Sequence, residues 1–381
     1  MTEKIYDSNP YLTEFDAEIV SISDKDVILN RTAFFPEEGG QTPDRGKIDG
    51  INVTNVRIEG DTIIHTLESA IDNKCTVHGV VDWIHRFDNM QQHSGEHIFS
   101  GLVHNKYGYN NVGFHLSDNI CTMDFDGELT DVEIEELEHD VNEVIVKDVE
   151  IKAYYPSKES LKNMEYRSKK EIDGDVRIVI IGDVDKCACC APHVKSTGQI
   201  GMLKVLSFMR HRGGVRISIA AGFRALNLFR EKMHLLESLV NEFTTAEENI
   251  PAMVVKLKEE NKDLKYKCSR LNREYMINRA SEISEEVKSV TMFTEDADMN
   301  DAREIVNELV KKHNGYCGVF VGTDKDGYKF VIGSNELNCK ELADDLRSRF
   351  GAKCGGSEVM IQGNIDKTEE EIRKEIEIKY T

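Results

Sequence analysis

Two pairs of potential metal ligands constrain the fold of this chain more than any other feature. His93 and His97 form one pair, Cys189 and His193 form the other, and each pair is spaced i, i+4. On a helix, this spacing puts both side chains on one face, within reach of a single ion. Three imidazoles and one thiolate suit Zn²⁺, which takes nitrogen and sulfur ligands in a tetrahedral arrangement. If both pairs bind the same ion, two segments that are far apart in the sequence have to meet in the folded chain.

Length and composition favour an ordered globular protein of two or three domains. The 381 residues are 40% hydrophobic and include only six prolines, and a chain of this length can bury more than one core. No apolar run reaches the roughly 18 residues of a membrane-spanning helix, and the first residues have no signal-peptide pattern. The nine cysteines include a cluster at Cys187, Cys189 and Cys190. An odd count without a secretion signal favours reduced thiols and metal binding over disulfides, and we expect a cytoplasmic protein.

The formal net charge of −21 weighs against a general affinity for nucleic acids, because contact with phosphates needs clustered lysine and arginine side chains. Three basic segments nevertheless stand out against this average, at residues 210–216, 262–279 and 347–353. Any one of them alone is more often ordinary solvated surface.

Short alternating segments predict a small β-barrel or sandwich in residues 1–88. Glycine and aspartate clusters separate these segments at intervals of roughly 8–12 residues, as in small all-β domains. Residues 89–224 predict an α+β unit that carries both ligand pairs. The elements predicted in this unit are helices at 89–107 and 132–147 and strands at 148–155 and 176–181.

Residues 225–288 have the pattern of two heptad helices. Apolar side chains recur at steps of three and four between Leu226 and Phe243, and the same spacing recurs between Val254 and Tyr275. Pro251 can open the second helix, because the N–H that it lacks is not needed in a first turn. The short break between the two runs predicts an antiparallel helical hairpin, which is either an internal strut or the seam of a homodimer. The C-terminal domain is the other candidate surface for a homodimer.

From residue 289 onward, strand and helix patterns alternate and predict a separate C-terminal α/β domain. Two apolar runs flank the sequence DKDG at 324–327, which is a clear hairpin turn signal. The elements predicted here are strands at 289–293, 316–322, 328–332 and 358–362, helices at 300–313, 336–350 and 367–379, and a loop at 351–357. The predicted fold class of the whole chain is therefore α+β.

The first ligand pair lies in the sequence HSGEH at 93–97. H-x-x-E-H is also the inverted motif of zinc peptidases, in which the glutamate is the general base. Those enzymes need a downstream carboxylate ligand, whereas the obvious partner here is the sequence CCAPH at 189–193. Two histidines on a helix are often only polar surface, but two ligand pairs in one chain make that explanation much weaker. Among the cysteines, Cys189 is the predicted ligand, and Cys187 and Cys190 are expected to pack beside it.

Four blocks give the chain a resemblance to a known family. Their sequences are TAFFPEEGGQ at 32–41, MQQHSGEH at 90–97, CCAPHVKSTGQIG at 189–201 and GGVRISIAAG at 213–222. In this order they resemble the editing domain of alanyl-tRNA synthetase and its free-standing relatives. The sequence CGGS at 354–357, followed by Gln362 and Gly363, resembles the glycine-rich domain at the end of that synthetase. The resemblance spans nearly the whole chain.

The resemblance implies a trans-editing enzyme, an aminoacyl-tRNA deacylase. Such proteins hydrolyse the ester that joins a wrong amino acid, usually serine or glycine, to the tRNA for alanine. Because the first block lies close to the start of the sequence, we expect the synthetase's aminoacylation module to be absent, so that the protein deacylates tRNA and does not charge it. The implied cofactor is one Zn²⁺ ion and the implied partner is mischarged tRNA. The candidate contacts to the RNA backbone, which position an RNA without reading its sequence, are Arg210, Arg212, Arg216, Arg347, Arg349 and Lys353.

The sequence departs from the family pattern in three places. Family members usually carry a Cys-Gly-Gly-Thr-His block, whereas Cys190, Ala191 and Pro192 form the middle of the block here. A glutamine is common at the position of Glu96, and the terminal loop is poorer in glycine than usual. These differences leave the metal ligands intact and bear on local geometry, substrate preference and the RNA contacts of the terminal domain.

Three residues are candidates for the catalytic site. The hydroxyl of Thr32 can bond the hydroxyl of a serine substrate, whereas alanine would leave a buried hydroxyl unpaired, and such mismatches discriminate strongly. Gln41 is a candidate partner for the substrate's amino group or its terminal adenosine, and the two glycines before it predict a tight turn with positive φ. Glu96 is either the general base, by analogy with the peptidases, or a solvent-facing helix residue. The Zn²⁺ ion either activates a water or only orients the terminal ribose.

Two other functions stay open from the sequence. A zinc peptidase would have an aspartate or glutamate ligand in place of Cys189. A non-enzymatic module would use zinc to stabilise its fold, and it would bind tRNA or mediate oligomerisation without hydrolysing any ester.

Overall fold

The computed structural model describes residues 1–72, 75–168, 175–295 and 297–378. Contacts divide the chain into two compact units, Met1–Glu237 and Ser238–Thr381, and each unit has its own buried cores. Helices and several separate sheets occur in the chain, so the predicted α+β class is confirmed. The predicted division into four parts stays a prediction. Among the described residues, no helix is long and apolar enough to cross a membrane.

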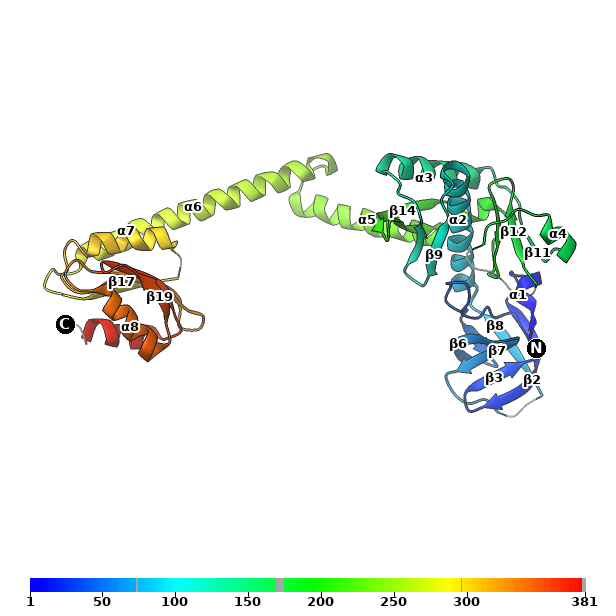
Figure 1. Ribbon diagram of the computed structural model, residues 1–381, viewed down its shortest axis with the longest axis horizontal. Coiled ribbons are helices and arrows are strands. Elements are labelled where there is room, and N and C mark those ends of the chain that lie inside the picture. Colours follow the sequence, from blue (N-terminus) through cyan, green and yellow to red (C-terminus); the bar gives the residue numbers. More distant parts are fainter. Residues whose placement is uncertain (73–74, 169–174, 296, 379–381) are drawn as a thin grey trace. The chain divides into compact units, whose positions relative to one another are not determined.

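The N-terminal region of the first unit is a closed six-stranded barrel (Figure 1). Alternation along the strands builds it: in β8, Val77, Gly79 and Val81 are buried and the residues between them are exposed. The buried side chains form one core that includes Phe15, Leu29 and Phe34. In barrel order the strands are β2 (Glu14–Ser23), β3 (Asp26–Leu29), β7 (Thr62–Leu67), β6 (Ile51–Glu59), β5 (Gly46–Ile48) and β8 (Thr76–Val81).

Two short strands lie outside the barrel and form a parallel pair, β1 (Glu3–Lys4) with β4 (Arg31–Thr32). The one-turn helix α1 (Ile5–Ser8) follows β1 and buries Tyr6. The ring of Tyr6 meets that of Phe35 edge-on at 5.4 Å between centroids. This contact attaches the start of the chain to the segment that follows β4.

The long helix α2 (Trp83–Tyr107) follows the barrel and carries the first ligand pair. It begins six residues before the predicted position of 89, because the Asp82 side chain caps it by accepting hydrogen bonds from the N–H groups of Ile84 and His85. It ends at Gly108, which adopts the left-handed conformation with φ 73°. Fifteen of its 25 residues are buried, so α2 is the central helix of this unit.

Two sheets and one further helix pack around α2. The helix α3 (Asp131–Val146) lies close to the predicted range of 132–147, and Thr130 and Glu133 form its capping box. Predictions for the strands were incomplete, because only those near 151 and 178 had been expected. The four-stranded sheet has the order β14 (Leu203–His211), β15 (Gly214–Ala221), β10 (Cys121–Phe125) and β9 (Asn111–Leu116). The three-stranded sheet has the order β11 (Ile151–Tyr154), β12 (Ile178–Ile181) and β13 (Asp185–Ala188).

Short helical segments complete this part of the first unit. The helix α4 (Lys158–Lys162) is capped by Ser157, and one 3₁₀ turn, η1 (Thr197–Ile200), packs against α2 and α3. A single core joins α2, α3 and both sheets, and it includes Phe99, Leu137 and Ile217. This core holds the ligand-bearing helix in a fixed position between the sheets.

Two long helices follow at the positions predicted from the heptad pattern. They are α5 (Gly222–Phe243) and α6 (Ile250–Glu282), with the short η2 turn (Glu247–Asn249) between them. Pro251 lies in the first turn of α6, as predicted. The boundary between the two compact units falls within α5, and the antiparallel pairing of the two helices stays a prediction.

The second unit contains a five-stranded sheet with helices packed against it. α7 (Met299–Leu309) contacts the central strands β17 and β18, and α6 runs beside α7 (Figure 1). The predicted hairpin at 324–327 joins β17 to β18. The strand order is β16 (Val290–Thr294), β17 (Cys317–Thr323), β18 (Gly327–Gly333), β20 (Met360–Ile365) and β19 (Lys353–Gly356).

Two predictions for this unit were wrong in detail. The glycine-rich segment predicted as a loop contains an edge strand, β19, because its backbone pairs with β20 from Lys353 to Gly356. The predicted last helix consists of α9 (Glu369–Arg373), which Thr368 caps, followed by a π-helical turn at Lys374–Ile378. The helix α8 (Cys339–Phe350) ends as predicted, at Phe350 before Gly351.

Candidate metal centre

The fold brings the two ligand pairs together at the centre of the first unit. His93 and His97 come from consecutive turns of α2, and Cys189 and His193 come from the segment that follows β13. One ligand atom from each of the four side chains lies within 4.8 Å of the others. The Cys189 Sγ is 3.5 Å from His93 Nε2 and 3.4 Å from His193 Nε2. This arrangement can hold one metal ion.

The second ligand pair is not helical, which corrects the use of helical spacing for it. Residues 189–193 form an irregular loop, and Pro192 disfavours the helical conformation of Ala191, the residue before it. The Arg177 guanidinium supports this loop by donating to the carbonyl oxygens of Cys189 and Ala191 at 3.0 and 2.9 Å. A turn in the loop, rather than a helix face, brings Cys189 and His193 to the same point.

Hydrogen bonds fix the orientation of all three imidazoles. His93 Nδ1 is 2.7 Å from the Gln41 side-chain oxygen, and His193 Nδ1 is 3.0 Å from the Ser94 hydroxyl. His97 Nδ1 is 2.8 Å from an oxygen of Asp185. Because each Nδ1 has a partner, each histidine presents Nε2 to the centre of the cluster.

Sequence analysis missed Asp185, which holds His97. Asp185 lies at the start of β13, is 5% exposed, and accepts a second hydrogen bond from Arg167 Nε at 2.8 Å. Burial raises the pKa of Asp185, but the hydrogen bond from His97 and the charges of His97 and Arg167 outweigh it, so that its pKa is lowered. A carboxylate that supports a ligand histidine is a recurrent feature of metal sites. Its place four residues before Cys189 was the signal available in the sequence.

The electrostatics of the cluster favour a thiolate at Cys189. Burial raises the pKa of this thiol, but the charges of His93 and His193 and their hydrogen bonds outweigh burial and bring the pKa well below its ordinary value. Burial lowers the pKa of His193 to about 3. For His97, burial also lowers the pKa, but the hydrogen bond to Asp185 and the nearby Cys189 outweigh burial, so that its pKa is raised. A thiolate and neutral imidazoles are the forms in which cysteine and histidine bind metals.

The neighbouring cysteines differ from Cys189. Burial raises the pKa of Cys187 to about 11 and also raises the pKa of Cys190. Both side chains therefore remain neutral thiols. Cys187 is 1% exposed and lies near His97 and Asp185, whereas Cys190 packs against the barrel core. These positions agree with the packing roles expected for the two cysteines.

The loop that carries Gln41 closes one side of the cluster. Gly39 and Gly40 have φ values of 64° and 85°, which confirms the predicted turn with positive φ. A Cβ atom on Gly40 would lie 2.4 Å from the backbone oxygen of Phe114, so only glycine fits there. Gln41 is 1% exposed, and its side-chain nitrogen has no hydrogen-bond partner among the described residues. Gln41 therefore orients His93 and keeps one donor available.

Thr32 lies fully buried at the edge of the barrel. Its hydroxyl is 2.8 Å from His65 Nε2 and accepts a hydrogen bond from the N–H of Phe34 at 3.1 Å. His65 Nδ1 lies 3.2 Å from the carbonyl oxygen of Val27, and burial lowers the pKa of His65 to about 4. The imidazole is therefore neutral, carries its proton on Nδ1, and accepts at Nε2. It follows that the Thr32 hydroxyl donates to His65 and can serve another group only as an acceptor.

Glu96 does not face solvent, so the solvent-facing alternative was wrong. Glu96 is 1% exposed, and one of its oxygens accepts hydrogen bonds from the Ser100 hydroxyl and the Asn111 side-chain amide, each at 2.6 Å. It is not among the four residues that can share an ion. These contacts connect α2 to β9 at the position of Asn111.

The candidate RNA-binding residues lie in both units. Arg210 and Arg212 are exposed near the hairpin between β14 and β15, whereas Arg216 is held by Asp124 through hydrogen bonds of 2.6 and 2.7 Å. In the second unit, the side chains of the remaining three candidates are also exposed, but two of them form ion pairs. They are Arg347, paired with Asp344, Arg349, paired with Glu375, and Lys353.

Comparison with known proteins places the chain among translation proteins. Residues 176–218 match the family model described as the threonyl and alanyl tRNA synthetase second additional domain, and residues 4–85 match the model of class II (A) tRNA synthetases. The first of these matches covers β12, β13 and the loop with Cys189 and His193.

Similar proteins include both separate editing proteins and larger ligases. The alanyl-tRNA editing protein AlaX-L of Pyrococcus horikoshii is 30% identical over 98% of this chain and 96% of its own length. The alanyl-tRNA editing protein Aarsd1 of Danio rerio is 28% identical over 93% of this chain and 91% of its own length. An alanine–tRNA ligase of Thermococcus kodakarensis is 30% identical over 96% of this chain, but over only 42% of its own length. The chain therefore belongs to the family of alanyl-tRNA editing proteins.

Proposed function

We propose that this protein is a zinc-dependent aminoacyl-tRNA deacylase, which hydrolyses the ester of tRNA for alanine that carries serine or glycine. The observation that carries this proposal is the convergence of His93, His97, Cys189 and His193 in one buried cluster. The name of its relative AlaX-L, an alanyl-tRNA editing protein with almost the same extent, gives the substrate class. Ester hydrolysis requires only that a labile bond be positioned and that one water be activated.

The donor set supports zinc as the metal. One thiolate and three imidazole Nε2 atoms match the ligands and the number that Zn²⁺ takes, and a soft sulfur ligand argues against Mg²⁺ or Ca²⁺. When bound, Zn²⁺ supplies a Lewis acid beside the ester. The lowered pKa of Cys189 favours its thiolate, which is the form that binds a metal.

Thr32 is the residue we propose for the choice of amino acid. Because its proton is donated to His65, it can accept a hydrogen bond but cannot donate one to the substrate. The serine hydroxyl is a donor and alanine has none, so only serine pairs with the remaining acceptor position of Thr32. This account favours serine over glycine as well, since glycine also lacks a hydroxyl.

Gln41 has two roles in this proposal. Its oxygen holds His93, and its unpaired nitrogen donates to the carbonyl of the ester or to the terminal ribose. The contacts of Glu96 with Ser100 and Asn111 favour a structural role. A role of Glu96 as general base stays a prediction from the peptidase motif. The peptidase alternative itself is not favoured, because the four-residue group contains no carboxylate.

For the whole chain we propose four functional parts. Residues 1–88 and 89–224 form the editing site, residues 225–288 connect it to the terminal domain, and residues 289–381 form a domain that contacts the tRNA. Arg210 and Arg212 in the first unit, and Lys353, Arg347 and Arg349 in the second, are the proposed backbone contacts. Their exposure supports this role, and the strong ion pair of Arg216 with Asp124 makes Arg216 the weakest candidate.

We also propose that α6 forms the seam of a homodimer. Its heptad positions are unusually exposed for apolar residues, with Leu257 at 55%, Leu264 at 63% and Leu271 at 59%. Exposed apolar stripes of this kind are typical of protein interfaces. Sedimentation velocity of wild type and Leu264→Glu tests the proposal. We expect a dimer that the substitution converts to monomer, and a wild-type monomer at all concentrations would contradict it.

Deacylation of charged tRNA tests the proposed function. Wild type, Cys189→Ala and the control Cys190→Ala are incubated with tRNA for alanine charged with serine, glycine or alanine, and zinc is measured in each preparation. We expect rapid loss of serine, slower loss of glycine and no loss of alanine. Cys189→Ala should lose zinc and more than about a hundredfold of the turnover, since even residues that only support metal ligands contribute 10–100-fold.

The control variant distinguishes loss of the metal ligand Cys189 from loss of the neighbouring thiol of Cys190. Cys190→Ala removes an adjacent thiol that is not in the four-residue group, so zinc content and turnover should be retained. A zinc-loaded wild-type protein that hydrolyses none of the three esters would overturn the proposed function and favour a module that only binds tRNA.

A further inference from the structure

A polar pocket with a volume of about 340 Å³ opens at the surface of the first unit. Three segments line it: residues 42–45 after the Gln41 loop, residues 54–55 of β6, and residues 117–119 after β9. None of these residues belongs to the metal cluster, and none was singled out from the sequence as a site residue.

The pocket begins directly beside the metal centre. Thr42 follows Gln41, which is bonded to His93, and the Thr42 N–H donates to the carbonyl oxygen of Leu116 at 3.0 Å. Ser117, on the other wall, follows Leu116 in the chain. Two residues earlier, the ring of Phe114 lies 4.6 Å from the ring of His93, measured between centroids. Both walls of the pocket are therefore continuous with the walls of the metal site.

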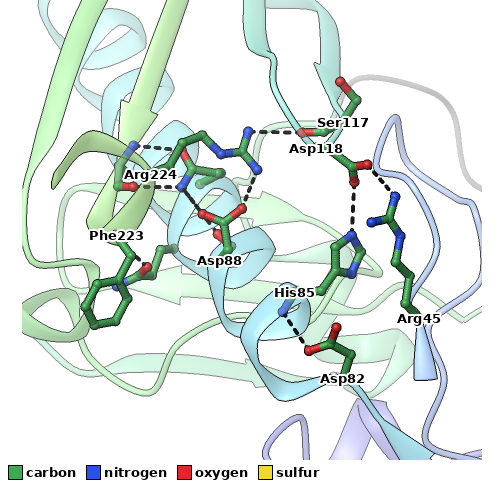
Figure 2. A network of polar contacts seen from close by, with 11 residues as sticks. Arg45, Asp82, His85, Asp88, Ser117, Asp118, Phe223 and Arg224 are labelled. Carbon is green, nitrogen blue, oxygen red and sulfur yellow. Dashed lines mark hydrogen bonds and ion pairs between the residues drawn. The ribbon is translucent and has the colours of Figure 1, made fainter. Parts of the chain in front are cut away.

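The carboxylates of the pocket are already paired, so the pocket is not simply an acidic cluster. Figure 2 shows Asp118 between Arg45 and His85, with an oxygen of Asp118 at 3.2 Å from His85 Nε2. Asp44 is held by the buried guanidinium of Arg86. Next to this group, Arg224 links Asp88 to the carbonyl oxygen of Ser117. The network keeps this wall rigid and leaves the Arg45 side chain 58% exposed at the rim.

The remaining groups are hydroxyls and amides. Asn55 and Asn119 both line the pocket, and neither side chain forms a hydrogen bond within the parts of the chain that the structure describes. Asn55 follows a register shift in the pairing of β6 with β7, and such bulges commonly re-aim side chains next to active sites. The residues that line the pocket include no aromatic ring. Amides, hydroxyls and an arginine are the groups that contact sugar and phosphate, whereas base stacking needs aromatic rings.

One stripe of α2 connects the pocket to the metal centre. His85, Asn89 and His93 are spaced four residues apart, so they lie on one face of the helix. His85 touches Asp118 in the pocket wall and His93 touches Gln41, which places Asn89 between these two contacts. Eight residues correspond to about 12 Å along a helix axis, so His85 at the pocket wall and His93 at the metal centre are about two helical turns apart.

Unpaired polar atoms are concentrated along this stripe. Asn89 is 0% exposed, and among the described residues neither its amide oxygen nor its nitrogen has a hydrogen-bond partner. The Thr42 hydroxyl and the Gln41 side-chain nitrogen are also buried without a hydrogen-bond partner among the described residues. Of these three residues Thr42 lines the pocket, and Gln41 and Asn89 lie on the side toward the metal centre. Because a buried polar group without a partner is destabilising, this group of three points to a ligand that supplies the partners.

We propose that this pocket binds the sugar and phosphate of the 3′-terminal nucleotide of the RNA substrate, and that Asn89 and Gln41 bond to the end of that nucleotide that carries the ester. Asn55, Asn119 and Arg45 contact the sugar–phosphate backbone at the mouth of the pocket. The proposal rests on the proposed function, because it names how that substrate enters the same site. Without stacking partners, the pocket recognises the backbone more than the base.

Binding of uncharged RNA tests the pocket independently of hydrolysis. The ligands are an acceptor-stem hairpin that ends in CCA and the same hairpin without the terminal adenosine. The proteins are wild type, the double variant Asn55→Ala/Asn119→Ala, and the control Thr76→Ala, which removes an exposed barrel side chain outside the pocket. For the CCA hairpin, wild type and control should bind equally, and the double variant should bind about tenfold more weakly, as expected for two lost hydrogen bonds.

Removal of the terminal nucleotide makes the test specific. Wild type should lose about tenfold in affinity when the adenosine is absent, whereas the double variant should hardly distinguish the two hairpins. With the seryl ester, the double variant should raise KM about tenfold and change kcat less than twofold, with zinc content unchanged. Equal loss of affinity in both proteins on removal of the adenosine, with KM unaltered, would overturn the proposal.

Asn89→Leu distinguishes a ligand contact from a structural one. Replacement of an unpaired buried amide by an apolar group of similar size should leave Tm unchanged or raise it, while KM for the seryl ester rises. A fall in Tm with an unchanged KM would instead show that Asn89 serves only the fold. Failure of wild type to hydrolyse any ester would count against the proposed function, whereas normal hydrolysis with insensitive variants would count against the pocket alone.

Discussion

The two longest helices of the molecule, α2 and α6, show opposite relations between sequence pattern and burial. In α2, 15 of 25 residues are buried, and many of these are polar, including Arg86, Asn89 and both histidines of the metal cluster. In α6, only 3 of 33 residues are buried, although its sequence has a heptad-like apolar repeat. A regular heptad repeat therefore identified a helix here without identifying a buried one.

The two helices differ in where their polar side chains find partners. Along α2, most buried polar groups have specific partners from other segments, such as Asp44 for Arg86 and Asp185 for His97. Along α6, charged side chains pair with neighbours on the same helix or on α7 and remain exposed. A buried charge needs a partner, so α2 depends on side chains far away in the sequence, whereas α6 depends mainly on its own.

The largest effect on stability is expected at Arg86. Its guanidinium donates to the Asp44 carboxylate at 2.9 Å and to the carbonyl oxygens of Pro10 and Ala33 at 2.9 and 2.6 Å. Arg86→Met would leave the Asp44 charge buried and should lower the free energy of unfolding of the first unit by about 3–5 kcal/mol. Denaturant unfolding measures this change, and the double variant Asp44→Asn/Arg86→Met should recover part of the loss. A loss below about 1 kcal/mol would show that the buried ion pair of α2 matters no more to stability than the exposed pairs of α6.

On acidification, the free energy of unfolding should fall by about 3 kcal/mol because of His65. Burial lowers its pKa to about 4 from 6.5, so the unfolded chain binds a proton that the folded chain excludes between these values. The stability due to His65 is therefore fully present above pH 6.5 and is lost as the pH falls toward 4, at 1.36 kcal/mol for each pKa unit. Between pH 7 and pH 4, the free energy of unfolding should fall less steeply with pH in His65→Gln than in wild type. Identical slopes for both proteins would mean that the pKa of His65 is the same in the folded and unfolded chain.

At Asp185 the expected effect is on zinc affinity. Asp185→Asn keeps a side chain of the same shape but removes the charge that supports His97, so the dissociation constant for zinc should rise 10–100-fold. Asp183→Asn is the matched control, because Asp183 is exposed in the turn before β13. Competition with a chromophoric chelator measures both constants, and equal values for the two variants would show that the carboxylate does not support the metal.

The smallest effect is expected at Arg270 of α6, which matches Arg86 in chemistry but not in burial. Its guanidinium is 3.7 Å from Glu274, and both side chains are more than half exposed. Arg270→Met should change the free energy of unfolding of the second unit by less than about 0.5 kcal/mol, as for other exposed i, i+4 pairs. A loss comparable to that of Arg86→Met would show that pairing alone, and not burial, decides the stability of such contacts.

The sequence allowed good predictions where a local signal existed. Pro251 marked the start of α6, the DKDG turn marked the hairpin of β17 and β18, and the glycines before Gln41 marked a turn with positive φ. The start of α2 was misplaced although the sequence carries a signal for it, since Asp82 is a suitable N-cap and Trp83, Phe87 and Met90 follow it at helical spacing. The strands β9 and β10, and β14 and β15, form two local hairpins that were missed, and the pairing of β10 with β15 joins segments that are distant in the sequence.

In the site, the residue types that bind metals could be predicted, but not the groups that hold them. For Asp185, which holds His97, the sequence offers only its place four residues before Cys189, and nothing in the sequence indicates that Arg167 contacts Asp185. The hydrogen bond between Thr32 and His65 joins β4 to β7, two strands that do not pair with each other. The buried position of Glu96 was also missed, since its partners Ser100 and Asn111 are hydroxyl and amide side chains without a motif. Such contacts depend on tertiary packing.

X-ray absorption at the zinc edge tests the central claim most directly, because it reports the ligands of the bound metal in the intact protein. The account predicts one sulfur at about 2.3 Å and three imidazole nitrogens at about 2.0–2.1 Å, with the sulfur lost in Cys189→Ala and kept in Cys190→Ala. A site that contains only nitrogen and oxygen, or one that keeps its sulfur in Cys189→Ala, would contradict the assignment of these four side chains as the metal centre.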